Sequence, residues 1–257
     1  RIAALADVGV IGAASPSDIV AKVDRIITSL PVAAAFTEVT AKIADAGKPV
    51  VVADTSNLTI AEKEVGRLAL EAAGSSLLDC PVGGTGAQAA KGDIVVFGSG
   101  DGAAFARMRP FLERISRVVY HVGDFGAGSM MKYIHNLLVT IHNCSAAEAF
   151  VMASKAGLDL QTVHDVISSS VATSRIFEVR GPLMVAGDYD TNITAKLELL
   201  MKTIGCIADQ AREIGCPTPL FSLASEIHRS ALAQGRGQSD PAVVCDVMEQ
   251  WAGVTRG

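Results

Sequence analysis

The first half of this sequence alternates short apolar runs with longer helical stretches, and this alternation constrains the fold more than any other feature. The apolar runs occupy residues 25–30, 49–54, 77–79, 94–97 and 118–120. Helical spacing of apolar residues is found between them, at residues 33–46, 59–73 and 103–114. Strands that alternate with helices form a parallel sheet with crossover helices. Because the runs are continuously apolar, we expect an open, doubly wound α/β sheet with helices on both faces.

The pattern changes after Gly128. Residues 129–156 contain neither Pro nor Gly, and their apolar residues recur at helical spacing, so one helix of about 28 residues is expected. Further helices are expected at residues 160–169, 175–185, 195–214, 221–234 and 241–251, with no strand among them. The sequence therefore predicts an α/β domain at residues 1–125 and an all-α domain at residues 126–257, which opens with the long connecting helix.

Composition restricts the classes of partner. The chain has 257 residues, of which 49% are hydrophobic and 19% charged, and its net charge is −5. It has no basic block and no Lys/Arg stretch interleaved with aromatic residues, which disfavours nucleic acid. No apolar run reaches the roughly 18 residues of a membrane span, and the N-terminus lacks a signal-peptide pattern. We therefore expect a cytoplasmic protein with no membrane partner.

The cysteines and histidines give no support to a metal site. The five cysteines are scattered, with no CxxC spacing, and are expected to be reduced. His135 and His142 are neither three nor four residues apart, so they cannot pair as ligands on one helix face. The sequence thus predicts no bound metal.

The glycine motif that usually opens a dinucleotide-binding sheet is absent here. No G-x-G-x-x-G follows a predicted strand. The segment Gly98-Ser99-Gly100-Asp101-Gly102 does follow a strand, but its third glycine comes too soon, and we interpret it as a loop. Residues 1–9 instead resemble the end of a helix, so a first βα unit of about 30 residues is expected upstream of Arg1.

A loop poor in side chains follows the third predicted strand, with the sequence Asp79-Cys80-Pro81-Val82-Gly83-Gly84-Thr85. Glycines allow a tight turn, and they also allow backbone N–H groups to face an anion. Both interpretations stay open on these residues alone. Asp79 is interpreted as a turn or cap residue rather than as a base.

Three glycines, Gly123, Gly126 and Gly128, precede Lys132 and Asn136 at the start of the long helix. They allow the backbone to approach a neighbouring group, and the two polar residues, four apart, project from one helix face. The positive end of the helix dipole disfavours a lysine there. The same field, with partial burial, would lower its pKa toward a value suited to proton transfer. A solvated surface lysine is the alternative.

In order and spacing, these motifs resemble those of the β-hydroxyacid dehydrogenases, the family of 3-hydroxyisobutyrate dehydrogenase and tartronate semialdehyde reductase that is related to 6-phosphogluconate dehydrogenase. The segments that carry the resemblance are Leu30-Pro31, Asp54–Asn57, Asp79–Thr85 and Gly123–Asn136. The resemblance covers nearly the whole chain. It implies a Rossmann-type cofactor domain and an all-α substrate and oligomerisation domain. It also implies hydride transfer between NAD or NADP and a small β-hydroxy acid or semialdehyde carboxylic acid.

The resemblance also implies roles for individual residues. Lys132 would be the general acid/base and Asn136 would orient the substrate. The backbone of Gly83, Gly84 and Thr85 would bind the substrate carboxylate. Cofactor contacts are implied for Leu30, Pro31, Asn57 and Lys202, and the protein would be a homo-oligomer, either dimer or tetramer. The residue that separates NAD from NADP would lie near or before Arg1.

Two other functions remain open. Imine reduction uses the same scaffold, but those relatives usually replace the catalytic lysine, so Lys132 argues against it. The second is a catalytically silent module that binds an acid or forms an oligomer. The identity of the substrate is also open, because Gly83-Gly84-Thr85 stands where the family usually has Ser-Gly-Gly.

Overall fold

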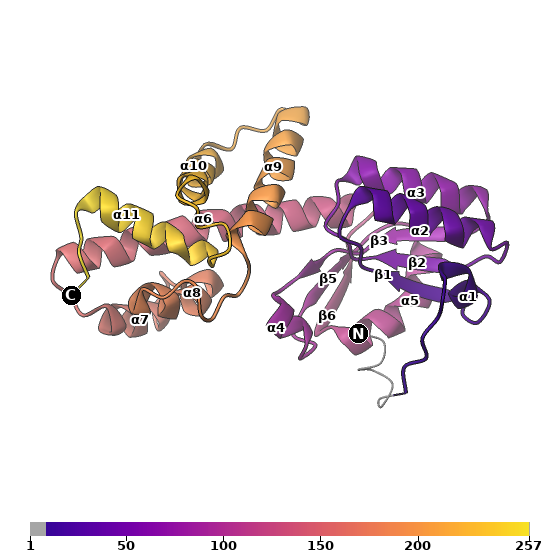
Figure 1. The fold of residues 1–257 in the computed structure, drawn as a ribbon, viewed down its shortest axis with the longest axis horizontal. Coiled ribbons are helices and arrows are strands. Elements are labelled where there is room, and N and C mark those ends of the chain that lie inside the picture. Colours follow the sequence, from indigo (N-terminus) through magenta and orange to yellow (C-terminus); the bar gives the residue numbers. More distant parts are fainter. Residues whose placement is uncertain (1–8, 257) are drawn as a thin grey trace. The chain divides into compact units, whose positions relative to one another are not determined.

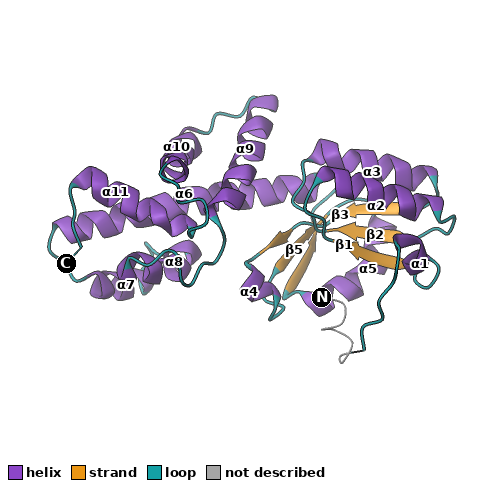
Figure 2. Cartoon of the chain, viewed as in Figure 1, coloured by secondary structure: helices purple, strands orange, loops and turns teal. Residues whose placement is uncertain are grey.

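The computed structural model describes residues 9–256, and contacts within it divide the chain into two compact units. Unit 1 contains the residues up to Gly84 together with Gln88–Lys132, and unit 2 contains Thr85–Ala87 and the chain from Tyr133 onwards. The strands of the described chain all lie in unit 1 (Figure 2). The helix end expected at residues 1–9 falls outside the described residues, Gly9 excepted.

Unit 1 follows the predicted alternation of strands and helices. Its strands are β1 (Arg25–Thr28), β2 (Val51–Asp54), β3 (Ser76–Asp79), β4 (Val82–Gly83), β5 (Val95–Gly98) and β6 (Val118–His121). The helices of this part of the chain are α1 (Pro16–Val20), α2 (Ala33–Asp45), α3 (Ile60–Ala72), α4 (Gly86–Ala89) and α5 (Gly102–Ile115). The short elements α1, β4 and α4 were not predicted, because none is long enough to show a periodic pattern.

The strands pair mainly in parallel. β1, β2 and β3 form a parallel sheet in that order, and β5 pairs in parallel with β6. β4 is antiparallel to β5, with Val82 opposite Val96, and an isolated bridge joins Asp79 to Ser99. The connection between β4 and β5 is too short for the crossover that a parallel neighbour requires. The predicted parallel sheet is therefore confirmed, with β4 as an antiparallel addition.

Residues along β2 face two different cores. Val52 packs in a cluster with Phe36 of α2 and Leu70 of α3, whereas its neighbour Val51 packs in a cluster with Met108 of α5. Helices therefore cover both faces of the sheet, α2 and α3 on one and α5 on the other (Figure 1). This Rossmann-type, doubly wound arrangement confirms the predicted fold class and explains why β2 is buried at every position.

Helices joined by loops make up the described part of unit 2, as predicted. Its elements are most of α6 (Ala127–Lys155), then α7 (Leu160–Ser168), α8 (Arg175–Ala186), α9 (Leu197–Glu213), α10 (Pro219–Ala233), the short 3₁₀ helix η2 (Pro241–Val243) and α11 (Val244–Ala252). Asp159 and Ser174 cap the N-termini of α7 and α8 through their side chains. One cluster of buried residues, including Phe150, Phe177 and Met248, forms the core.

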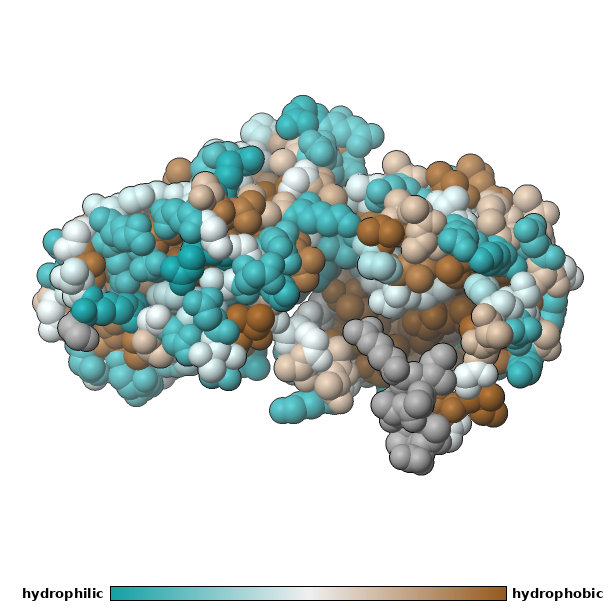
Figure 3. Space-filling model, in the orientation of Figure 1, coloured by the Kyte–Doolittle hydropathy of each residue, from teal (hydrophilic) through white to brown (hydrophobic). Residues whose placement is uncertain are grey.

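By length and composition, α6 could cross a membrane, although the sequence shows no uninterrupted apolar run of that length. The core helix of a water-soluble protein passes the same test. Cys144, Ala147 and Phe150 of α6 are buried within the core of unit 2, and the face of that unit drawn in Figure 3 is mainly hydrophilic. Packing inside unit 2 therefore accounts for the buried part of α6, whereas Ile134, Leu138 and Met152 of the same helix are exposed.

Candidate active site

The predicted cofactor contacts of unit 1 lie at the carboxyl ends of two neighbouring strands. Leu30 and Pro31 follow β1, and Asn57 follows β2. Because Thr28 and Asp54 are paired in register at the ends of these parallel strands, the three residues share one edge of the sheet. Leu30 is half-buried, while Pro31 and Asn57 are exposed. Open α/β sheets bind their ligands at this edge.

A buried carboxylate fixes the chain at this edge. Asp54 Oδ1 accepts hydrogen bonds from Thr28 Oγ1 at 2.8 Å and from Ser56 Oγ at 2.6 Å. Ser56 Oγ accepts a further hydrogen bond from the main-chain N–H of Leu30 at 2.8 Å. Asp54 thus holds the segment after β1 through one serine.

A buried lysine joins this carboxylate to a second one. The Lys63 ammonium, carried by α3, lies 3.1 Å from Asp54 Oδ2 and 2.8 Å from Asp79 Oδ1, and these side chains are at most 1% exposed. Burial by itself would lower the pKa of Lys63, but attraction to Asp79 and Asp54 outweighs burial and raises that pKa above its ordinary value. Lys63 is therefore a charged ammonium at neutral pH.

Sequence reasoning missed Lys63. A signal was present, because Lys63 lies at helical spacing from Gly66 and Leu70, and all three are buried on one face of α3. A lysine on the buried face of a helix is almost always paired with an acidic group. The partners themselves, at the ends of β2 and β3, could not be chosen without the register of the sheet.

Asp79 ties the network to the start of α6. Asp79 Oδ2 accepts a hydrogen bond from the N–H of Ser129 at 2.7 Å, and Oδ1 accepts one from Ser129 Oγ at 2.9 Å. N–H groups in the first turn of a helix have no partner within the helix, and a negative charge is favoured there. The prediction that Asp79 is a turn or cap residue is consistent with this contact, although Ser129 follows it by fifty residues.

Ser99 and Gly128 complete this junction. Ser99 Oγ accepts a hydrogen bond from the N–H of Gly128 at 2.9 Å and donates one to the main-chain oxygen of Asp79 at 3.2 Å. A Cβ atom added to Gly128 would clash with the main-chain oxygen of Phe97 and would lie 2.6 Å from that of Asp79. The close approach that the glycines predict is therefore made to the ends of β3 and β5.

The glycines of the loop after β3 have local structural roles. Gly83 is buried in β4, opposite Val95. Gly84 has a φ of +142°, which favours glycine, and a Cβ atom there would lie 2.7 Å from Ile94 Cγ2. The tight-turn interpretation therefore explains Gly84 without a ligand, and binding of an anion by the backbone of this loop stays a prediction.

Lys132 lies on α6 one turn after Ser129 and is partly buried. Among the residues that the structure describes, no carboxylate pairs with its ammonium. Burial without a compensating charge lowers the pKa of Lys132 to about 8. A lysine with a pKa this close to neutrality can donate a proton as the ammonium and accept one as the amine.

The other predicted site residues belong to unit 2. Asn136 is buried on α6, four residues after Lys132 and so on the same helix face, with its Oδ1 atom 2.9 Å from His135 Nδ1. Thr85 is partly buried just before α4, and Lys202 is exposed on α9. No group of three or more metal-ligating side chains occurs within residues 9–256.

Both halves of the chain match known family models. Residues 1–123 match the model described as the NAD binding domain of 6-phosphogluconate dehydrogenase. Residues 126–248 match the model described as NAD-binding of NADP-dependent 3-hydroxyisobutyrate dehydrogenase. The two matches follow one another along the chain and together include all the predicted site residues.

Similar proteins support these matches. L-threonate dehydrogenase from Escherichia coli (strain K12) is 36% identical over 77% of this chain, which spans only 65% of that enzyme. L-threonate dehydrogenase from Cupriavidus necator is 34% identical over 94% of this chain and 82% of its own length. The structure of 3-hydroxyisobutyrate dehydrogenase from Salmonella typhimurium is 34% identical and superposes with a TM-score of 0.84. The match covers 96% of this chain and 87% of that one. An imine reductase from Myxococcus stipitatus, 16% identical with a TM-score of 0.62, shares the fold alone.

Proposed function

Since this chain belongs to the β-hydroxyacid dehydrogenase family, we propose that it transfers a hydride between NAD or NADP and a small β-hydroxy acid or semialdehyde acid. The observation that carries the proposal is Lys132, a partly buried lysine to which residues 9–256 offer no acidic partner and whose pKa is lowered to about 8. In reduction its ammonium would give a proton to the carbonyl oxygen while the carbonyl carbon receives the hydride. In oxidation its amine would take the hydroxyl proton.

The carboxyl edge of β1 and β2 suits a nicotinamide dinucleotide, which supplies or accepts the hydride when bound. Leu30 is held there by a hydrogen bond to Ser56, and the exposed Pro31 and Asn57 border the same edge. We assign these three residues, together with Lys202 of unit 2, to cofactor binding. This set orients the cofactor and does not take part in proton transfer.

The substrate class follows from the acids on which the relatives are named to act. Similar proteins are called dehydrogenases of L-threonate, of 2-(hydroxymethyl)glutarate and of 3-hydroxyisobutyrate. Each of these compounds carries a carboxylate and a hydroxyl group. For this chain, the backbone of Gly83, Gly84 and Thr85 would bind the carboxylate, and Asn136 would orient the hydroxyl-bearing carbon beside Lys132.

A titration followed by a turnover assay tests the proposal. Binding of NADH and NADPH is measured by cofactor fluorescence, and turnover is then measured on the three named acids and on a cyclic imine. We expect binding of at least one cofactor and turnover of at least one acid. Binding without turnover of any acid, or turnover of the imine alone, would favour the silent module or the imine reductase respectively.

The pH dependence of turnover has a predictable sign. Reduction needs the ammonium of Lys132, so kcat/KM for reduction is expected to fall about tenfold per pH unit above pH 8. Oxidation needs the amine, so kcat/KM for oxidation is expected to rise through the same pH and to level off above it. Initial rates in both directions between pH 6 and 10 check this. Profiles that bend in the same direction would remove Lys132 from the proton transfer.

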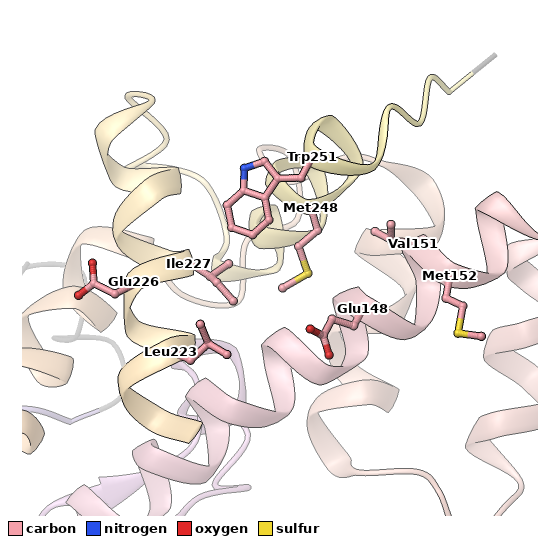
Figure 4. A pocket seen from close by; sticks show the side chains of 8 residues that line it. All are labelled: Glu148, Val151, Met152, Leu223, Glu226, Ile227, Met248 and Trp251. Atoms are coloured by element: carbon pink, nitrogen blue, oxygen red, sulfur yellow. The ribbon is translucent and has the colours of Figure 1, made fainter. Parts of the chain in front are cut away.

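For the oligomer, we propose that the protein is a cytoplasmic homo-oligomer whose contact face in unit 2 includes an apolar groove of about 550 Å³. Val151 of α6, Leu223 and Ile227 of α10 and Met248 of α11 line its floor, with Trp251 beside it (Figure 4). Trp251 and Leu223 are each 63% exposed. Large exposed apolar side chains gathered around a groove are typical of contact surfaces between proteins.

Mass measurement in solution tests this contact face. By size-exclusion chromatography with light scattering, the parent is expected at a multiple of the chain mass of 26.6 kDa. Trp251→Glu is expected to shift the mass toward that of one chain, because it places a charge in a desolvated contact. Leu68→Glu, at an exposed leucine of α3 in unit 1, is the matched control and should leave the mass unchanged. A parent of 26.6 kDa would contradict the proposal.

A further inference from the structure

We infer that Lys63 is a positioning residue, which links the proposed cofactor contacts after β1 to the helix that carries Lys132 through two serine relays. The inference rests on the proposed function of Lys132 and of the segment after β1. Lys63 itself touches neither substrate nor cofactor, because its ammonium is enclosed by Asp54 and Asp79.

Each relay runs through one serine hydroxyl group, although Ser56 donates to a carboxylate oxygen and Ser99 to a main-chain oxygen. In the first, Ser56 Oγ donates a hydrogen bond to Asp54 and accepts one from the N–H of Leu30. In the second, Ser99 Oγ donates to the main-chain oxygen of Asp79 and accepts from the N–H of Gly128, the second residue of α6. Each acidic residue therefore reaches, through one hydroxyl group, a main-chain N–H of a segment that the proposed reaction needs.

Lys63 is the single cation that joins the two relays. Its ammonium lies within 3.1 Å of both carboxylates. Asp54 Oδ2 accepts no hydrogen bond in the part of the chain that the structure describes. Its ion pair with Lys63 therefore compensates the cost of burying this oxygen. Without Lys63, two buried carboxylates would face each other with no neutralising charge, and the segments that they hold would move.

The position of the ammonium is itself fixed by its helix. α3 begins with a capping box, in which Thr59 Oγ1 accepts a hydrogen bond from the N–H of Glu62 and the Glu62 carboxylate accepts one from the N–H of Thr59. Lys63 follows directly after this first turn. A positioning role requires that the main chain carrying the lysine is rigid, because a misplacement of reacting groups by about 1 Å can lower the rate about a hundredfold.

Alanine variants of the two serines separate the relays, because each removes one hydroxyl group and no bulk. Ser56→Ala is expected to raise the cofactor Kd, measured by fluorescence, roughly tenfold, and to leave kcat at saturating cofactor within about twofold. Ser99→Ala is expected to lower kcat roughly tenfold and to leave the cofactor Kd within about twofold. Lys63→Met is expected to change both quantities.

The matched control is Ser116→Ala, at another buried serine of unit 1, whose Oγ donates to the main-chain oxygen of Leu112 at 2.6 Å. It is expected to change neither quantity. A network that served stability alone would lower the unfolding midpoint of the variants without this split between Kd and kcat.

The inference is overturned if both serine variants leave Kd and kcat unchanged, or if both change the two quantities alike, while Lys132→Met abolishes turnover. Failure of the proposed function looks different. A parent that binds neither NADH nor NADPH, or a Lys132→Met variant with full turnover, overturns the function and the relay that depends on it.

Discussion

Replacing Lys132 with Met is expected to lower kcat by at least about a hundredfold, with the Kd for the cofactor within about twofold of the parent. A positioned general acid/base contributes roughly 10²- to 10⁴-fold to rate, and Met has similar length but no titratable group. The reaction would then rely on water for its proton. Steady-state rates together with cofactor fluorescence measure the two quantities on the same preparation.

Two controls accompany this variant. Lys22→Met, at an exposed lysine of unit 1, should keep parental turnover. The thermal unfolding midpoint of Lys132→Met should equal or exceed that of the parent, because burial of the Lys132 ammonium is unfavourable, as the lowered pKa of about 8 indicates. The residual rate should also lose its bend near pH 8. A variant that keeps turnover within tenfold of the parent would show that another group moves the proton.

Replacing Lys63 with Met is expected to lower the free energy of unfolding by about 3–5 kcal/mol, the usual cost of removing one partner of a buried ion pair. Asp54 and Asp79 would be left buried without a countercharge, and the hydrogen bonds from Asp79 to Ser129 would compete with carboxylate repulsion. Domains of this kind are usually stable by only about 5–15 kcal/mol. Urea unfolding of parent and variant measures the difference.

Lys22→Met again provides the comparison, and should change the free energy of unfolding by no more than about 0.5 kcal/mol. A loss below about 1 kcal/mol for Lys63→Met would mean that solvent reaches the two carboxylates once the ammonium is gone. In that case the network would not be the rigid element on which the positioning role depends.

Sequence alone predicted the features that repeat locally. The strands and long helices follow from the periodicity of apolar residues within each segment, and Val51 and Val52 on opposite faces of β2 belong to the pattern that indicated helices on both sides. A lowered pKa of Lys132 was also expected, from the field at the helix start together with partial burial, and burial is the cause that the structure gives.

Sequence was ambiguous where one local pattern serves two purposes. Gly84 needs a φ of +142° and lies against Ile94, which a tight turn explains as well as an anion site does. Asp79 was interpreted as a turn or cap residue, but nothing near it in the sequence identifies Ser129 and Lys63 as its partners. In both cases the residue type indicates the local role, whereas the sequence does not identify the group that the residue contacts.

Only the tertiary structure decided which distant residues meet. Five residues spread over 75 positions of the chain converge because β2 pairs in register with β3, a bridge joins Asp79 to Ser99, and the start of α6 packs on the ends of β3 and β5. They are Asp54, Lys63, Asp79, Ser99 and Gly128. Periodicity reports which side of an element is buried and is silent on what that side touches. The apolar pattern of the sequence therefore determined the strands and helices. The register of the sheet and the burial of charged side chains determined the network around Lys63.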